Sequence, residues 1–285
     1  MIRTVGARRG RRSAVRCVLS LLLMSPLRGA GAGTDVPKEA DTARQDVATM
    51  LANEGLAAQH KDHYAYISKE RSERTGGHLW TEKVVETDAG KVRMLLTEDG
   101  QPLGPQREAA ERGRLAAIVA DPDGFQRKSQ ALKDDEAHAL QLLTLLPKAF
   151  VFGDARDEGG YLAIDIKTNP EFQPQSMEER VLHGMSGTVL IDPKAMRLHH
   201  IEARLPQDVS IGFGFLATIR AGSKFATTRD PLGQPDWKTT VLDTEINGKA
   251  IFFKAIAKNE HAEHSDFVRV SNDLTVAQAV ALAEQ

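Results

Sequence analysis

The segment His261-Ala262-Glu263-His264 holds the closest grouping of side chains that could bind a metal. A zinc site needs three or four such ligands that converge on one point. Successive residues of a strand face opposite sides of the sheet, so His261 and Glu263 share one face while His264 takes the other. The set is therefore split. We interpret the segment as a solvated strand end and keep a metalloenzyme or hydrolase as the last of three hypotheses.

The other polar clusters offer no catalytic arrangement. His199-His200 places its two rings on opposite faces of a strand, so at most one could join a site. The acidic pairs Asp134-Asp135 and Glu178-Glu179 lie in helix-like segments and are typical of solvated helix faces. The chain has no Gly-x-Ser-x-Gly turn, no phosphate-binding glycine loop and no His-Glu-x-x-His helix. We expect a protein without catalytic activity, bound metal or cofactor.

An apolar set in the last third of the chain indicates a different chemistry, the binding of a greasy ligand. The segment from Val209 to Ile219 alternates apolar residues with small or polar ones. Gly212, Gly214 and Gly222 interrupt this region, and glycines in strands mark sharp curvature or a close approach of backbone. One interpretation is a sheet core that bends around a helix, and the other is a half-open barrel that holds an acyl chain. The candidate lining residues are Ile211, Phe213, Phe215, Ile219, Phe252 and Leu143.

The elements that would carry these residues follow from hydrophobic periodicity. The capping-box pattern Thr42-x-x-Gln45 begins a predicted helix that ends near His60. Strands joined by turns follow over residues 63–96, and period-two patterns return after Pro147. Two helices are predicted between them, over residues 105–120 and 129–146.

Four further features complete the pattern. Asp121-Pro122-Asp123-Gly124 is expected to interrupt the helical structure between the two middle helices. Val209 to Ile219 is predicted to be one strand. Residues 241–246 and 251–256 are predicted to form a hairpin around Asn247-Gly248-Lys249. Residues 274–284 could be a short amphipathic helix or a frayed tail. The fold class is therefore α+β, with one large antiparallel sheet that must curve because so many strands share it.

The first 32 residues have the three-part layout of a secretory signal peptide. They contain seven arginines and no acidic residue, then the apolar run Val18–Met24, then small residues that end in Ala30-Gly31-Ala32. We expect cleavage after Ala32, a linker over residues 33–40 and a soluble mature protein in the periplasm; the sequence leaves the Sec or Tat route open. The apolar run is too short to cross a bilayer as a helix, and we expect no transmembrane segment in the mature protein.

Removal of this leader would change the chemistry of the chain. The whole chain has 37 basic and 39 acidic residues, and the seven leader charges are all arginines, so the remainder has 30 against 39 and a net charge near −9. An acidic protein of this kind is not expected to bind nucleic acid or to dock electrostatically on anionic lipid. Cys17, the one cysteine, lies in the leader. The mature protein therefore has no disulfide, thiolate nucleophile or cysteine metal ligand.

The segment Gly187-Thr188-Val189-Leu190-Ile191-Asp192-Pro193-Lys194, with Arg197-Leu198 and Ile201-Glu202 after it, resembles the Gly-x-hydrophobic-x-Ile-Asp-Pro strand-turn-strand of LolA/LolB-like outer-membrane lipoprotein-sorting proteins. Asn169-Pro170-x-Phe172, the stretch 208–214 and the stretch 222–225 are similar to an exported, Acidobacteria-type group with that fold. The resemblance covers residues 41–270, with a helical insertion at 105–146 and a C-terminal tail at 271–285.

This resemblance implies a curved antiparallel sheet that forms an incomplete barrel, with helices packed on its concave side. In the sorting family that cavity shields lipoprotein acyl chains. No position here matches the family's cavity arginine, since nothing singles out Arg204 or Arg220. Our leading hypothesis is a periplasmic carrier or binding protein for a lipid-like ligand, a lipid or a lipoprotein acyl chain. The alternative is a non-catalytic envelope module that binds a protein partner.

Overall fold

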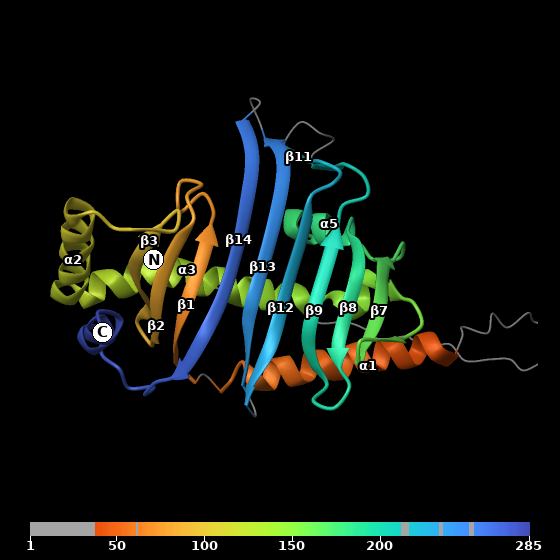
Figure 1. Cartoon of the computed structure of the whole chain (residues 1–285). Coiled ribbons are helices and arrows are strands. Elements are labelled where there is room, and N and C mark those ends of the chain that lie inside the picture. Colours follow the sequence, from red (N-terminus) through yellow and green to blue (C-terminus); the bar gives the residue numbers. More distant parts are fainter. Residues whose placement is uncertain (1–37, 61, 212–216, 234–235, 251–253) are drawn as a thin grey trace, which may run out of the picture. The chain divides into compact units, whose positions relative to one another are not determined.

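The computed structural model describes residues 38–60, 62–211, 217–233, 236–250 and 254–285 (Figure 1). The chain divides into a unit of residues 1–35 and a unit of residues 36–285, and all described residues lie in the second.

One antiparallel sheet of 14 strands organises the described residues. Its main path has the strand order β4-β3-β2-β1-β14-β13-β12-β9-β8-β7-β5. Outside this path, β6 pairs with β7, β11 pairs with β13, and β10 pairs with β11. The sheet is not closed, because β4 and β5 have no contact through a strand ladder. The prediction of an α+β fold with a large antiparallel sheet is therefore confirmed. The strands are β1 Tyr64–Arg71, β2 Trp80–Thr87, β3 Gly90–Glu98, β4 Gln101–Pro102, β5 Phe150–Phe152, β6 Arg156–Glu158, β7 Tyr161–Thr168, β8 Ser186–Asp192, β9 Arg197–Arg204, β10 Val209–Ile211, β11 Ala217–Ile219, β12 Lys224–Gly233, β13 Asp236–Ala250 and β14 Lys254–Arg269.

The helices precede, interrupt and follow the strands. They are α1 Lys38–Ala57, α2 Pro105–Ala120, α3 Pro122–Leu143, α4 Leu146–Ala149, α5 Met177–His183 and α6 Val276–Ala283. In the view of Figure 1, α3 passes behind the strands from the side of α2 toward β7. Within the described ranges, no helix is long and apolar enough to cross a membrane.

Helix α1 packs on one face of the sheet, which we call the α1 face. Val47 and Met50 of α1 are buried against strand residues that include Ile164, Val189 and Ile201. Val189 of β8 pairs with Ile164 of β7 on one side and with Ile201 of β9 on the other, so the three side chains share a face. Their burial against α1 removes a continuous apolar surface from water and forms the largest of the apolar clusters among the described residues.

Helix α6 packs on the opposite face of the first strands. Ala65 of β1, Val85 of β2 and Val92 of β3 are buried against α6 and against Leu115 of α2. Ala65 and Glu70 are five positions apart in β1, so their side chains point to opposite faces of the sheet. Glu70 pairs with Ala262 on the α1 face, and Ala65 therefore points to the other face. We call this second surface the α6 face. A capping box of Thr275 and Gln278 begins α6, which decides between the predicted helix and the frayed tail.

Helix α3 begins seven residues before the predicted helix start at Ser129. The break is the single residue Asp121, whose Oδ1 accepts a hydrogen bond of 2.8 Å from the backbone N–H of Gly124. Pro122 occupies the first helical position, where a proline is tolerated because that N–H has no partner in a helix. The Asp-Pro-Asp-Gly pattern is therefore a helix start and not a loop.

Two strand predictions in the last third are wrong. Val209–Ile211 and Ala217–Ile219 pair with each other, so the alternating segment is not one strand. Strand β13 runs through Asn247-Gly248-Lys249 up to Ala250, so these residues are not a hairpin turn. A Cβ atom at Gly248 would lie 2.5 Å from the carbonyl oxygen of Thr218. The glycine is thus needed for the close approach of β11 to β13, a use that local sequence does not distinguish from a turn.

Candidate functional site

The β1–β3 end of the α1 face carries buried charges. The carboxylates of Glu70 on β1 and Glu82 on β2 retain only 7% and 3% of their side-chain exposure. Strand alternation places them there, because Ser68 pairs with Glu82 and lies two residues from Glu70. A buried carboxylate is costly unless a cation and hydrogen bonds accompany it.

Arg74, from the turn between β1 and β2, binds both carboxylates. Its Nε donates to Glu70 Oε1 at 3.0 Å, and its Nη1 donates to Glu82 Oε1 at 3.0 Å. Arg93 on β3 adds a contact of 2.9 Å from Nη1 to Glu82 Oε2, and the Ser72 hydroxyl donates to Glu70 Oε1 at 2.6 Å. Two carboxylates and two guanidiniums balance in charge. We call Glu70, Arg74, Glu82 and Arg93 the charged cluster.

The charged cluster keeps the Glu70 carboxylate ionised. Burial alone would raise the pKa of Glu70, but the hydrogen bonds from Arg74 and Ser72 and the charges of Arg74 and Arg93 outweigh it. The pKa of Glu70 therefore lies below its ordinary value. In the neutral range this end of the α1 face presents bound carboxylates, and no proton is available from Glu70 for acid catalysis.

Ser68 and His264 lie beside the charged cluster and face each other across β1 and β14. The Ser68 Oγ is buried without a hydrogen-bond partner in the described part of the chain. Burial lowers the pKa of His264, the Arg93 charge acts in the same direction, and Nδ1 lies 3.0 Å from the Thr239 carbonyl oxygen. A hydrolase would need a hydrogen bond between such a hydroxyl and the imidazole. The two side chains form none here.

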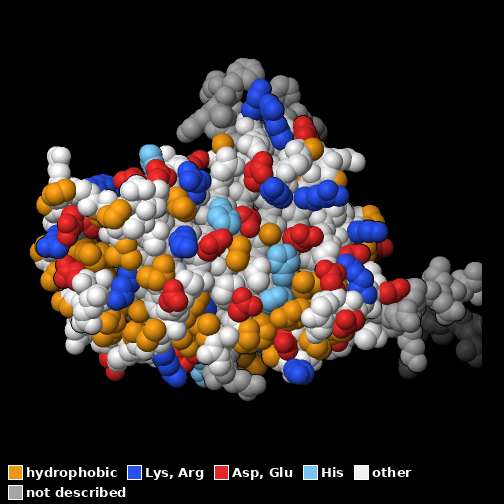
Figure 2. Space-filling view, in the orientation of Figure 1, with side chains coloured by type: hydrophobic (Ala, Val, Ile, Leu, Met, Phe, Trp, Pro, Cys, Tyr) orange, Lys and Arg blue, Asp and Glu red, His pale blue; other side chains and the backbone are white. Residues whose placement is uncertain are grey.

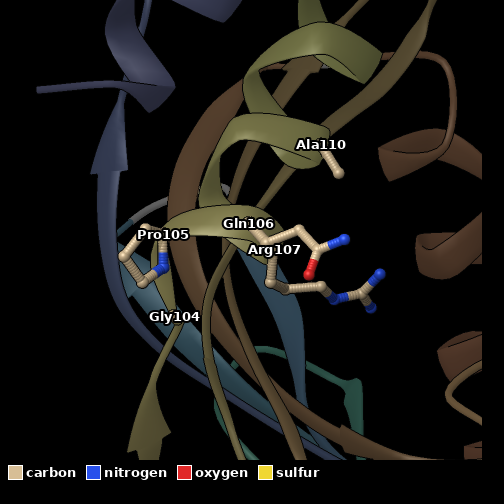
Figure 3. Close-up of a pocket in the computed structure, with 5 residues that line it drawn as sticks. All are labelled: Gly104, Pro105, Gln106, Arg107 and Ala110. Carbon is tan, nitrogen blue, oxygen red and sulfur yellow. The ribbon is translucent and has the colours of Figure 1, made fainter.

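An open pocket of about 470 Å³ adjoins this end of the sheet, at the start of α2. Figure 3 shows Gln106 and Arg107 extending to the same side of the first helical turn. The Arg107 guanidinium lies 5.6 Å from the Trp80 ring centre, and that of Arg74 lies 5.4 Å from it. Trp80 therefore links the pocket wall to the charged cluster through two cation–π contacts.

A second open cleft, of about 580 Å³, lies between the β1–β2 turn and strands β12 to β14. His261 is on its wall, with Nδ1 2.6 Å from Asp243 Oδ1. This hydrogen bond raises the pKa of His261, and burial opposes it only in part. Acidic and basic side chains alternate over the face shown in Figure 2, with no sign dominant. We call this space the turn cleft; its lining residues are Arg71, Ser72, Glu73, Gly76, Gly77, Lys224, Asp243, Thr244, Glu245, Asn259, Glu260 and His261.

The predicted apolar lining is not assembled among the described residues. Phe213, Phe215 and Phe252 lie outside them, as does the side chain of Ile211. Ile219 is buried in a small cluster with Met185 and Leu205, whereas Leu143 packs against the α1 core. The two described members of the set therefore belong to separate clusters.

His261 and His264 lie on opposite faces of the sheet, as strand alternation predicts. His261 is half exposed in the turn cleft, while the His264 ring lies tilted against Tyr66 on the α1 face with ring centres 5.1 Å apart. His199 stacks on Tyr161 at 3.9 Å, and the Nδ1 of His200 lies 2.9 Å from the Thr228 hydroxyl oxygen. These rings have separate structural contacts and do not converge.

Sequence reasoning missed the charged cluster. Glu70, Glu82 and Arg93 occupy strand positions of the kind that usually face water, and Arg74 lies in a turn. The one available signal was alternation, which puts Glu70 on the same side as Tyr66 and Ser68. Comparison with protein-family models, with curated proteins and with solved structures yields no match to this chain.

Proposed function

We propose that the protein is a periplasmic carrier or binding protein for a lipid-like ligand with an acyl chain. In this proposal residues 1–32 direct export, and residues 41–270 form a LolA/LolB-like incomplete barrel. We assign α1 and α3 to its concave side, where α3 would cover the ligand.

The observation that supports this proposal is the change in chemistry across the α1 face. One row of directly paired residues crosses seven strands: Ile164, Val189, Ile201, Thr227, Leu242, Ala262 and Glu70. The row is apolar at the β7–β9 side and ends at the charged cluster. An acyl ligand with a polar headgroup has the same two parts, and each buried CH₂ contributes about 0.8 kcal/mol to binding.

The middle of this row is where we place the acyl chain. Thr227 and Leu242 are only partly buried, in contrast to Ile164 and Val189 under α1. Helix α3 begins on the α6 face, where Phe125 packs against the cluster of Ala65, Val85 and Val92, and it ends against the α1 core at Leu143. Figure 1 shows α3 crossing behind the central strands, and we place only its C-terminal half over this row. A ligand on this stretch of the row would exchange water for apolar contacts with Leu242 and Ala262.

Native mass spectrometry of gently purified protein, followed by lipid extraction, tests the proposal directly. We expect a mass increment that extraction with organic solvent recovers as a lipid. We also expect the delipidated protein to bind a fluorescent fatty acid. Protein that carries no lipid and takes up no acyl probe would overturn the proposal, and reproducible capture of one envelope protein without lipid would favour the protein-binding alternative.

Adjacent residues of β13 supply a matched pair of variants. Leu242 points to the α1 face and Val241 to the opposite face, and both are partly buried. Leu242→Asp should weaken probe binding by about tenfold or more, because it places a charge in the row that would contact the acyl chain. Val241→Asp should leave binding close to that of the unaltered protein. Equal effects of the two substitutions would contradict the placement of the ligand.

A further inference from the structure

The long strand β14 has an unpaired edge. Strand β1 pairs with β14 only from His261 to Arg269, because β1 ends at Arg71 opposite His261. On the side that faces β1, no described strand pairs with the segment Lys254–Glu260 of β14. On the other side, every residue of this segment pairs with β13. Figure 1 shows β14 continuing beyond the end of β1. An unpaired edge of seven residues is a template for another strand.

The contacts of β13 show which backbone groups face outward. The Asn247 N–H donates to the Ser223 hydroxyl at 3.1 Å, and the Asn247 carbonyl accepts from Arg220 N at 2.8 Å. The Asn247 backbone is therefore turned away from β14. Its partner Ala257 must then direct its own N–H and C=O away from β13, toward the free edge. Alternation gives Ala255 and Asn259 the same outward direction.

This edge is accessible. Ala257, Lys258 and Asn259 are exposed, and the segment contains no proline to block pairing. The turn cleft opens beside Asn259, Glu260 and His261. The turn cleft therefore provides space beside Glu260 for the end of a strand that pairs with this edge.

We propose that a second copy of the chain pairs antiparallel with this edge, about a two-fold axis at Ala257. The free segment is symmetric about that residue. The register places Ala257 opposite Ala257 of the partner, Ala255 opposite Asn259, and Lys258 opposite Ile256. The outward-facing residues form three hydrogen-bonded pairs, and the two sheets become continuous.

The charges of the segment select a second copy as the occupant. The two-fold register sets position 254, a lysine, opposite position 260, a glutamate, at both ends of the ladder. No lysine faces a lysine. Opposite charges directly across an antiparallel ladder stabilise pairing by about 0.2 to 1 kcal/mol each. In this register the two ends of the segment are therefore complementary in charge.

Engineered cysteines test the register, because Cys17 is the one natural cysteine and can be replaced by serine. Ala257→Cys should form a disulfide-linked dimer under mild oxidation, since paired Cα atoms lie about 5.5 Å apart. Ala255→Cys is the matched control, because its partner is Asn259 and the two new thiols are far apart. We expect cross-linking at least tenfold faster at position 257. Equal rates, or no cross-link, would overturn the proposal.

Light scattering after size-exclusion chromatography tests the association itself. The unaltered protein should show twice the single-chain mass at micromolar concentration. Ala257→Pro should reduce it to the single-chain mass, because proline removes an outward N–H that the monomer does not use. Ala257→Ser should remain dimeric. A protein that stays monomeric, or a dimer that survives Ala257→Pro, would show that this edge does not pair with a second copy.

Discussion

The Glu54 carboxylate of α1 and the Arg197 guanidinium of β9 form a buried ion pair between residues 143 positions apart, with Nε 2.6 Å from Oε1. The Glu54 side chain also accepts hydrogen bonds from Arg229 of β12 and from the Leu198 backbone N–H. Arg197 lies over the Trp237 ring. This set of contacts fixes α1 on its face of the sheet at one position, whereas the apolar core alone would tolerate sliding.

Replacing Glu54 by glutamine should strongly destabilise the protein. The substitution removes the buried negative charge that Arg197 and Arg229 share, and removal of one partner of a buried pair costs about 3 to 5 kcal/mol. Asp41→Asn on the exposed side of α1 is the control and should change stability by less than about 0.5 kcal/mol. Urea denaturation measures both. A change below about 1 kcal/mol for Glu54→Gln would show that the pair does not hold α1.

Acid should unfold the protein through Glu54 and Glu70. Burial would raise the pKa of each, but their arginine partners outweigh it and the pKa of each is lowered. The unfolded chain, with a glutamate pKa of about 4.3, then binds more protons than the folded one as the pH falls below about 5. The stability from these groups is present above that pH and is lost as the pH falls through the folded pKa. Glu54→Gln/Glu70→Gln should therefore show a shallower fall in urea midpoint from pH 7 to pH 3, and an unchanged slope would contradict this.

Arg74 should be the essential cation of the charged cluster. Arg74→Met leaves Glu70 and Glu82 with Arg93 alone, which contacts them at 3.6 and 2.9 Å. Because Arg74 is 40% exposed, we expect a loss of about 2 to 3 kcal/mol, below the cost for a fully buried pair. Arg107→Met, which removes the other cation from Trp80, should cost less than about 1 kcal/mol. Thermal unfolding compares the two variants, and similar losses would mean that packing on Trp80, not charge, is what Arg74 contributes.

Helix α2 should protect the outer edge of β3. Glu111 Oε1 accepts a hydrogen bond of 2.9 Å from the Leu95 N–H, and Arg114 donates to the Arg93 carbonyl. Glu111→Ala/Arg114→Ala should speed hydrogen exchange at the Leu95 amide by roughly fivefold, as expected for a bond of about 1 kcal/mol. The exposed pair Glu108 and Arg112 on the same helix supplies the control double variant. If the control changes exchange equally, general loosening of α2 is responsible.

His261 and His264 should titrate on opposite sides of the ordinary histidine pKa of about 6.5. The hydrogen bond to Asp243 raises the pKa of His261, and burial lowers that of His264. The stability from His261 is present below about pH 6.5 and is lost as the pH rises through its folded pKa. For His264 the folded state favours the neutral ring, so stability is lost as the pH falls below about 6.5. NMR titration, assigned with His261→Gln and His264→Gln, measures both, and coincident titrations would contradict this order.

The features that depend on local periodicity could be predicted from the amino-acid sequence. The helical spacing of apolar residues located α1, although this helix begins at Lys38 and not at the predicted cap Thr42. Pro105 and the Ala-, Glu- and Arg-rich stretch after it located α2. The two-residue pattern identified a strand-rich chain and placed His261 and His264 on opposite faces. These features need no knowledge of distant residues, because the backbone geometry of a helix or strand already determines which neighbours share a side. The prediction of a turn at Asn247-Gly248-Lys249 was wrong because it used only neighbouring residues. Gly248 is needed for the close approach of β11, a strand that is distant in the sequence.

Local patterns did not predict which strands pair or which side of each strand is covered; these features depend on the three-dimensional fold. The pairing of β1 with β14 joins residues about 200 positions apart, and it brings His264 beside Ser68 and leaves Lys254–Glu260 with a free edge. The charged cluster likewise draws Glu70, Arg74, Glu82 and Arg93 from three strands and a turn. Alternation in sequence shows that residues share a face, but not what packs on that face. A buried charge becomes favourable only when its partners arrive from elsewhere in the fold.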